Sequence, residues 1–338
     1  DMHLNFGWFS HPRFGSRDNT ANMREGANDT HKIGAWNPSS AVHAHAFGPS
    51  VDYIRGHTDN EPQRWTRQIM LLKGKTATGP NYFVFRDSAD PLNGDPDSLV
   101  PKWWNLRTVG GKNQVRVSAH GLQYTSSFGP RLEVQFLQPE RIRAETRQAS
   151  RTHNAYAHVD AWRVDGQPVI PSDKKVWKKT NETLSVTSVG PIGAQQDIVV
   201  VMAPGGEGES PPRAESIFDG VAKITTSEGT DWVFLDRHSV EFANAEVSFR
   251  GRAGAVRVRA GEVHLVLAEG PGQVGYQGTV LKSPVPVTKV IPIPQLRAPQ
   301  TTEIPGVEST ITFSLDPTQG DITQMVRGVR RQQPVSYT

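Results

Sequence analysis

The chain has 338 residues with 31 glycines, 25 prolines and no cysteine. It is therefore long enough for two domains, and it excludes disulfides, thiolate catalysis and zinc sites built on cysteine. The formal net charge of +3 does not support nucleic-acid binding by bulk charge, although a local basic cluster could still contact an anionic polymer. Because no run approaches about 18 consecutive apolar residues, the sequence predicts no membrane span. The chain begins at Asp1 without a leader pattern, so we expect a mature product or a fragment.

Polar and metal-capable side chains are dense in the first 31 residues. In residues 1–9 (DMHLNFGWF) the odd positions carry Asp, His, Asn, Gly and Phe, which share one face of a strand because side chains alternate. A polar row that ends in glycine suits a strand opening onto a site. The alternative is a solvated strand edge.

Short strand-like runs, separated by Gly, Pro, Asn and Asp, recur along the chain. Val256 and Val258 alternate with Arg257 and Arg259, a pattern that predicts one face in a core and the other in water. Residues 141–151 fit a short helix or a polar strand. Many short strands with turn residues between them predict an all-β fold of antiparallel sandwiches. The runs are 68–73, 82–86, 114–118, 132–137, 157–164, 197–203, 232–235, 246–250, 255–259 and 263–268.

Two changes in composition divide the chain. Residues 205–212 (GGEGESPP) are polar and low in β propensity, which indicates a boundary. Six prolines between 283 and 305 exclude a central strand and favour an extended strap. The sequence thus predicts two successive antiparallel β-sandwich regions, a larger domain over 1–205 and a smaller one over 213–283. A Pro-rich C-terminal strap and a basic tail follow over 284–338.

The row at 1–9 resembles the His-x-His-x-Asp-x-Gly-x-Phe signature of heparinase II/III-like polysaccharide lyases. His3 takes the place of the second His, Asn5 that of the Asp, and Asp1 stands where the first His belongs. Further segments follow in the order of the family, so that the resemblance covers about residues 1–110. These segments are 51–56 (VDYIRG), 65–69 (WTRQI), 81–87 (NYFVFRD) and 104–107 (WNLR). The resemblance implies the C-terminal β-domain portion of such a lyase, in the periplasm or secreted.

The resemblance also implies a zinc site at His3, Asp18 and His31. Two imidazoles and a carboxylate suit Zn²⁺, with a fourth coordination position left open. The alternative is that the three are separate surface groups.

β-Elimination from a uronic acid requires neutralisation of the carboxylate, a base for the C5 proton and an acid for the leaving oxygen. The resemblance implies that a Tyr and a His from a helical toroid act as base and acid. This chain has no such toroid, so its own catalytic residues are unknown. We expect the β portion of a lyase of the EC 4.2.2 type, with an acidic polysaccharide as ligand, a helical domain or chain as partner, and no nucleic-acid partner.

Three tryptophans are candidates for substrate binding, namely Trp36, Trp103 and Trp104, because planar aromatic rings stack on sugar rings. For one of the adjacent pair, burial in the core is the alternative. If these residues bind glycans without catalysis, the chain is instead a non-catalytic carbohydrate-binding protein. A further alternative is a cell-surface structural β protein, for which the Pro-rich strap and the basic tail would suit contacts with partners.

Two further polar pairs have the i, i+2 spacing that lets both side chains face one side of a strand. They are His43 with His45, and His158 with Asp160. Each pair could bind a metal or a substrate, but such pairs are more often solvated strand residues.

Overall fold

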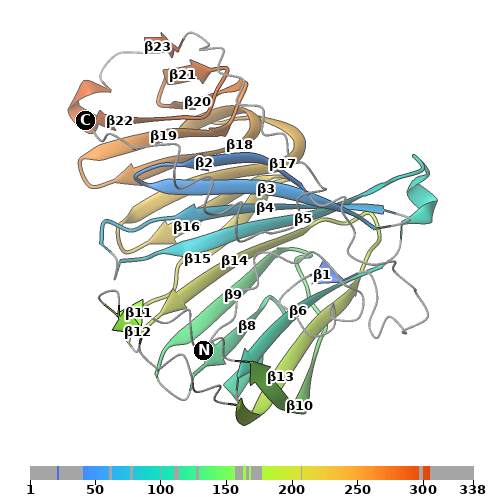
Figure 1. The fold of residues 1–338 in the computed structure, drawn as a ribbon. Helices are drawn as coiled ribbons and strands as arrows, with labels where there is room; N and C mark the ends of the chain where they lie inside the picture. Colours follow the sequence, from blue (N-terminus) through green and yellow to red (C-terminus); the bar gives the residue numbers. More distant parts are fainter. Residues whose placement is uncertain are drawn as a thin grey trace. The chain divides into compact units, whose positions relative to one another are not determined.

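A computed structural model describes most of the chain between residues 41 and 304 as strands (Figure 1). The described residues are 21–22, 41–60, 63–76, 79–99, 101–109, 114–126, 129–156, 163–164, 167–168, 177–206, 208–296 and 300–304. The helices among them are single 3₁₀ turns, such as η1 (Pro96–Ser98) and η4 (Ile293–Gln295). The predicted all-β class is therefore confirmed. Within the described residues, no helix has the length and apolar character needed to cross a membrane.

The strands form one small and three larger sheets, all within one compact unit, Asp1–Pro305. The eight-stranded sheet has the order β2-β3-β4-β5-β14-β9-β8-β7 and is antiparallel throughout. Its strands are β2 (Ala41–Phe47), β3 (Val51–Asn60), β4 (Gln63–Leu72), β5 (Tyr82–Pro91), β7 (Val115–Val117), β8 (Gly121–Thr125), β9 (Arg131–Gln138) and β14 (Ile198–Gly205).

The second sheet has four strands in the order β1-β6-β13-β10. They are β1 (Ala21–Asn22), β6 (Lys102–Val109), β10 (Ala144–Tyr156) and β13 (Trp177–Ile192). Most of the segment that fitted either a helix or a polar strand thus lies in β10. The two-stranded sheet consists of β11 (Arg163–Val164) and β12 (Gln167–Pro168).

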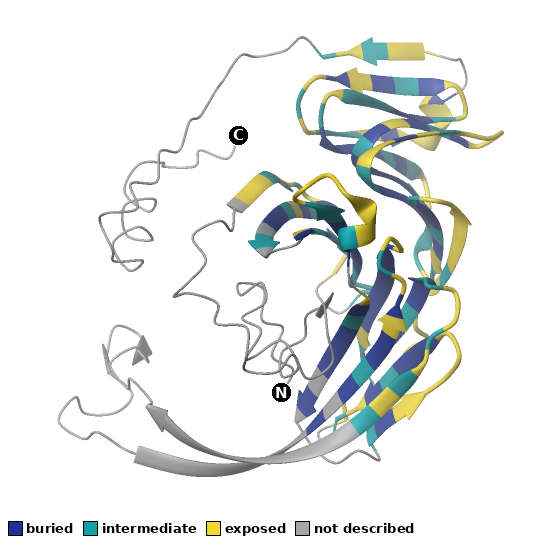
Figure 2. Cartoon of the chain, turned by 90° about the vertical axis from the view of Figure 1, so that its right-hand side faces the viewer, coloured by how far each residue is buried: buried dark blue, intermediate teal, exposed yellow. Residues whose placement is uncertain are grey.

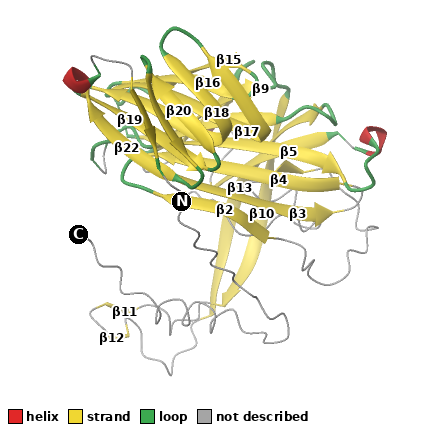
Figure 3. Cartoon of the chain, turned by 90° about the horizontal axis from the view of Figure 1, so that it is seen from above, coloured by secondary structure: helices red, strands yellow, loops and turns green. Residues whose placement is uncertain are grey.

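The third large sheet contains nine strands from the C-terminal part of the chain. They are β15 (Arg213–Phe218), β16 (Val221–Thr226), β17 (Gly229–Ala243), β18 (Val247–Arg259), β19 (Glu262–Glu269), β20 (Gly272–Tyr276), β21 (Thr279–Ser283), β22 (Val287–Pro292) and β23 (Gln300–Glu303). Seen from above, the strands fill the described part of the chain and loops occupy its rim (Figure 3).

The eight-stranded sheet is buried on both faces. On β14, Ile198 and Val200 lie in one core cluster, whereas Val199 and Val201 lie in another. The first cluster also contains Trp104 and other residues of the four-stranded sheet, and the second contains residues of the nine-stranded sheet. This two-sided burial explains why residues 198–203 form a continuous apolar run rather than an alternation of apolar and polar residues. Figure 2 shows the buried positions along these strands.

A third core lies on the other face of the nine-stranded sheet. On β17, Val233 belongs to the core shared with the eight-stranded sheet, while Phe234 belongs to this third core. There the ring of Phe234 stacks on that of Phe249, with a centroid separation of 4.4 Å. The nine-stranded sheet is therefore also apolar on both faces.

The segment 205–212 carries the chain from the eight-stranded to the nine-stranded sheet. The two sheets share a core, since Val201 on β14 and Val266 on β19 belong to the same cluster. The division into a larger domain over 1–205 and a smaller one over 213–283 stays a prediction.

The proline-rich segment contributes strands as well as a strap. β22 ends at Pro292 and pairs with β19 at the margin of the sheet, and β23 pairs in parallel with β21. Marginal positions are where prolines are tolerated, because they lack the N–H that a central strand must donate. The rest of the predicted strap and tail, from residue 305 on, lies outside the described residues.

Candidate functional site

The face of β3 that packs on the nine-stranded sheet changes from apolar to polar along the strand. Val51 and Tyr53 are buried in the shared core. Arg55, His57 and Asp59 continue the same row, because alternate residues of a strand face the same side. The neighbouring strand β4 changes in the same way, from Leu72 and Met70 in the core to the buried Gln68. We call this region the polar end, defined by His43, Tyr53, Arg55, His57, Asp59, Arg64, Gln68, Arg252 and Glu269.

Glu269, the last residue of β19, joins the nine-stranded sheet to the polar end. Its carboxylate accepts hydrogen bonds from the Tyr53 hydroxyl at 2.8 Å, from Arg55 at 3.0 and 2.9 Å, and from Arg252 at 2.9 Å. Burial acts to raise the pKa of Glu269, but the hydrogen bonds from Arg55 and Tyr53 outweigh it and hold that pKa below its usual value. The carboxylate therefore stays ionised and fixes both guanidinium groups.

Tyr53 is a poor candidate for a catalytic base. Its side chain is fully buried, donates to Glu269 and accepts a 3.0 Å hydrogen bond from Gln68. Burial, together with the negative charge of Glu269, raises the pKa of Tyr53 well above its usual value. The phenol therefore keeps its proton at neutral pH.

A β-bulge in β2 separates the two histidines that the sequence places two residues apart. In the register with β3, Val42 pairs with Gly56 and Ala44 with Arg55, so that His43 is the extra residue. A bulge re-aims the side chain it carries. The imidazole of His43 accordingly lies against that of His57, with ring centroids 4.2 Å apart, whereas the ring of His45 lies near Phe47. The expectation that His43 and His45 share a face is therefore wrong.

Charged groups surround the histidine pair. Asp59 lies 3.7 Å from Nε2 of His57 and is held by Arg64 through two hydrogen bonds of 2.6 and 2.9 Å. Burial, followed by the positive charge of Arg55, lowers the pKa of His43. Burial, followed by His43, lowers the pKa of His57. Both imidazoles are consequently neutral at pH 7.

Two other networks of charged side chains lie between the eight-stranded and nine-stranded sheets, where these side chains pair with one another and stabilise the fold. Asp231 accepts hydrogen bonds from Arg257 at 3.1 Å, from Arg259 at 2.8 Å and from the Tyr82 hydroxyl. Arg257 and Arg259 are only 2% and 5% exposed. The prediction that they face water is wrong, because a carboxylate from β17 compensates their burial.

The second network centres on Asp197, which accepts a 2.7 Å hydrogen bond from Arg86 and another from Arg237. Arg86 also donates to the Leu235 carbonyl at 2.7 Å. These contacts connect β5 of the eight-stranded sheet to β17 of the nine-stranded sheet.

The tryptophans on β6 point to opposite faces. Trp104 is 3% exposed and meets Phe136 edge to face at 5.2 Å, so the alternative of burial in the core holds for this residue. Trp103 is partly exposed and lies against Gly190, where a Cβ would come within 2.7 Å of its ring. Trp103 alone of the adjacent pair thus keeps ring surface for a ligand.

The other candidates from the sequence lie outside the described residues, namely His3, Asp18, His31, Trp36, His158 and Asp160. Among the residues that the structure describes, no group of three or more His, Asp or Glu side chains is arranged to hold a metal ion.

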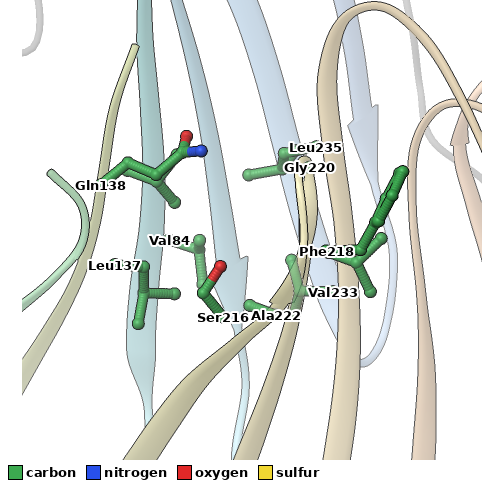
Figure 4. A pocket seen from close by; sticks show the side chains of 11 residues that line it. Val84, Leu137, Gln138, Ser216, Phe218, Gly220, Ala222, Val233 and Leu235 are labelled. Carbon is green, nitrogen blue, oxygen red and sulfur yellow. The ribbon is translucent and has the colours of Figure 1, made fainter. Parts of the chain in front are cut away.

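Two cavities lie away from the polar end. Figure 4 shows an apolar pocket between the sheets, lined by residues such as Val84, Leu137 and Leu235, with room of about 20 Å³. That volume suffices for about one water molecule. A groove of about 340 Å³ lies beside the 205–212 segment and is lined by Arg131, Glu133 and Glu228 among others.

No family model matches the sequence, and no curated protein matches it. Among solved structures, the chain is similar to the heparan sulfate lyase HepC from Pedobacter heparinus, with 12% identity, a TM-score of 0.37 and coverage of 58% of this chain. It is also similar to heparinase III (11% identity, TM-score 0.37, 57% of this chain). A third similar structure is the heparinase III BT4657 gene product (8% identity, TM-score 0.37, 86% of this chain). The chain spans 28%, 26% and 33% of the lengths of these three proteins.

Proposed function

We propose that the chain is the β portion of a polysaccharide lyase-like protein, periplasmic or secreted, and that its polar end binds an acidic polysaccharide. The observation that carries the proposal is the gathering of guanidinium and neutral imidazole groups at one end of the interface between two sheets. The order of sequence motifs in residues 1–110 supports the choice of a lyase.

Arg64 and Arg252 are the groups best suited to hold a carboxylate or sulfate of the polymer. Each donates hydrogen bonds to acceptors of the protein through its Nε and one of its two terminal nitrogens. Within the described residues, the other terminal nitrogen of each has no acceptor. Their side chains are 45% and 32% exposed, so both are accessible. Planar guanidinium groups bind anionic oxygens with geometric specificity, which makes them suitable for a polyanion.

We expect the chain alone not to cleave the polymer. Tyr53 and Tyr82 are both buried and both hydrogen-bonded to carboxylates, so neither is a credible base for the C5 proton. A helical domain or chain would supply the Tyr and His. Elimination creates an unsaturated uronide that absorbs in the ultraviolet, and we expect this absorbance only when such a helical partner is added.

The zinc site at His3, Asp18 and His31 remains part of the proposal. Because a bound metal stabilises the folded state, a chelator should lower the melting temperature if the site is filled. The zinc site would be contradicted if the purified protein holds no stoichiometric zinc and a chelator leaves its melting temperature unchanged.

Glutamine substitutions test the polar end directly. R64Q and R252Q should each weaken binding to an acidic polysaccharide roughly tenfold, the loss expected for a hydrogen bond to a charged group. The matched control is R116Q on β7, at the opposite margin of the eight-stranded sheet, where Arg116 is exposed. If the R64Q/R252Q double variant binds as tightly as the wild type, the polar end is not the binding site. If the wild type binds but no helical partner restores elimination, the chain is a binding module.

A further inference from the structure

The four-stranded sheet has a face that is turned away from the core, and Trp103 lies on it. Trp104, Val189 and Ala144 are neighbours across β6, β13 and β10 and contact the core shared with the eight-stranded sheet. Because side chains alternate along a strand, Trp103 and Arg143 point to the opposite side. We call this side the outer face, defined by Trp103, Arg141, Arg143, Glu145, Ser188 and Gly190.

A β-bulge in β13 fixes the Trp103 ring. In the register with β6, two residues, Gly190 and Pro191, stand opposite Trp103 alone. Bulges re-aim side chains in this way and recur next to functional sites. The ring lies against Gly190, where a Cβ would come within 2.7 Å of two ring atoms, so a larger residue there would displace it. Pro191 is exposed and adds apolar surface next to Trp103.

Gly190 lies between Trp103 and Arg143 in the sheet, since its N–H donates a 2.9 Å hydrogen bond to the Arg143 carbonyl. Because neighbouring strands lie about 4.8 Å apart, the backbones of Trp103 and Arg143 are about 10 Å apart. Both side chains are long enough to contact one sugar residue placed between them. The two residues thus form the ends of a row across β6, β13 and the start of β10.

Two guanidinium groups on the outer face are free to bind a ligand. Arg141 and Arg143 are exposed, and neither guanidinium group has an acceptor or an ion-pair partner among the residues that the structure describes. The residue between them, Ile142, packs on the core, and its N–H donates a 2.9 Å hydrogen bond to the Ala119 carbonyl. The backbone that carries both arginines is therefore anchored. Such groups bind carboxylates in a bidentate geometry.

We propose that Trp103 and Arg143, with Arg141, bind a uronic acid residue of an acidic polysaccharide at a second site, separate from the polar end. The indole ring stacks on the apolar face of the sugar, and the guanidinium groups bind its carboxylate. Glu145, two residues beyond Arg143 on the same face, bounds the site because its negative charge repels a further carboxylate. The inference rests on the proposed function, from which it takes the class of ligand.

Binding of an unsulfated uronic acid tetrasaccharide to the full chain tests the second site, in an R64Q/R252Q background that disables the polar end. We expect the background to retain binding and R143Q to weaken it roughly tenfold, the loss for a hydrogen bond to a charged group. Arg143 is exposed, so R143Q retains the fold. The matched control is R213Q, at an exposed position of β15 in the nine-stranded sheet, which should bind as the background does.

Tryptophan fluorescence gives a second measurement that a purely structural role of Trp103 would not affect. We expect the tetrasaccharide to change the fluorescence of the background, and W103F to abolish that change. W103F keeps an aromatic ring over Gly190, so the fold is retained. A fluorescence change that persists in W103F would overturn the proposal.

The binding results separate this site from the polar end. Equal affinities of R143Q, R213Q and the background would overturn the second site. Binding by the wild type but not by the background would also overturn it and would leave the polar end as the binding site. If the background binds as tightly as the wild type and R143Q weakens that binding, the second site is supported and the polar end is contradicted. Absence of binding by the wild type would overturn both.

Discussion

The hydroxyl of Tyr53 on β3 donates a 2.8 Å hydrogen bond to the carboxylate of Glu269 on β19, 216 residues later in the chain. The pair lies where the apolar core between the two sheets gives way to the polar end. Tyr53 is fully buried, whereas Glu269 is 8% exposed and also holds Arg55 and Arg252. One carboxylate thus joins the sheets and orders the guanidinium groups of the candidate site.

We expect Tyr53→Phe to lower the free energy of unfolding by about 1.5–3 kcal/mol, since it removes a buried hydrogen bond to a charged group. The control is Tyr276→Phe, where the hydroxyl accepts a 3.3 Å hydrogen bond from the neighbouring Gln277 at the surface. This control should change stability by less than about 0.5 kcal/mol. Urea unfolding measures both, and equal losses would contradict the role given to the Tyr53–Glu269 pair.

Asp231→Asn should be among the most destabilising single changes in the protein. Asp231 is 0% exposed and compensates the buried guanidinium groups of Arg257 and Arg259. Breaking a buried ion pair by removing one partner costs about 3–5 kcal/mol. Glu303→Gln, in an exposed pair with Lys282 at 3.2 Å, should cost no more than about 1 kcal/mol. Thermal unfolding that ranks the two variants in the opposite order would contradict the buried network.

Lys102 should make the protein more stable as the pH rises. Its side chain is fully buried near Trp65, and burial lowers its pKa from 10.5 to about 8. Between pH 8 and 10.5 the folded state has released the proton while the unfolded state still binds it, so stability increases with pH. The gain is about 3 kcal/mol at 1.36 kcal/mol per pKa unit.

Lys102→Met should remove this increase, whereas Lys75→Met, at an exposed position, should retain it. Unfolding free energies at pH 7.5 and pH 10 measure the effect. A Lys102→Met variant with the same rise in stability as the wild type would show that another group causes it.

Substitution should affect stability differently at the two adjacent tryptophans, because Trp104 lies in the core and Trp103 lies at the surface. Trp104→Ala should cost about 3–5 kcal/mol of stability because it empties a site in the core. Trp103→Ala should cost less, because that ring is partly exposed. If Trp103 stacks on a sugar ring, its loss should weaken glycan binding by about 1–3 kcal/mol. Similar unfolding midpoints for the two variants would contradict the placement of Trp104.

The fold class could be predicted because strands carry local signals. The predicted runs 82–86, 132–137 and 263–268 lie within β5, β9 and β19. Alternation does not reveal what lies opposite a face, however. Arg257 and Arg259 alternate with valines as a solvated face would, yet their partner Asp231 comes from β17, 26 and 28 residues earlier. Only the sheet pairing brings these charges together.

The candidate site was less predictable for the same reason. The spacing of His43 and His45 indicates a shared face, but the register with β3 creates the bulge that separates them. The link from Tyr53 to Glu269 joins distant strands and leaves no local signal. The polar row of β3 was visible in principle, since Arg55, His57 and Asp59 continue the alternation of Val51 and Tyr53.

The most direct test of the proposed function is equilibrium binding of the full chain to an unsulfated polymer of uronic acids and to the same polymer with its carboxyl groups reduced to alcohols. Because the polar end offers guanidinium donors to anionic oxygens, we predict binding to the acidic polymer that weakens with added salt and is lost on carboxyl reduction. Equal binding to both polymers, or no binding to either, would contradict the account.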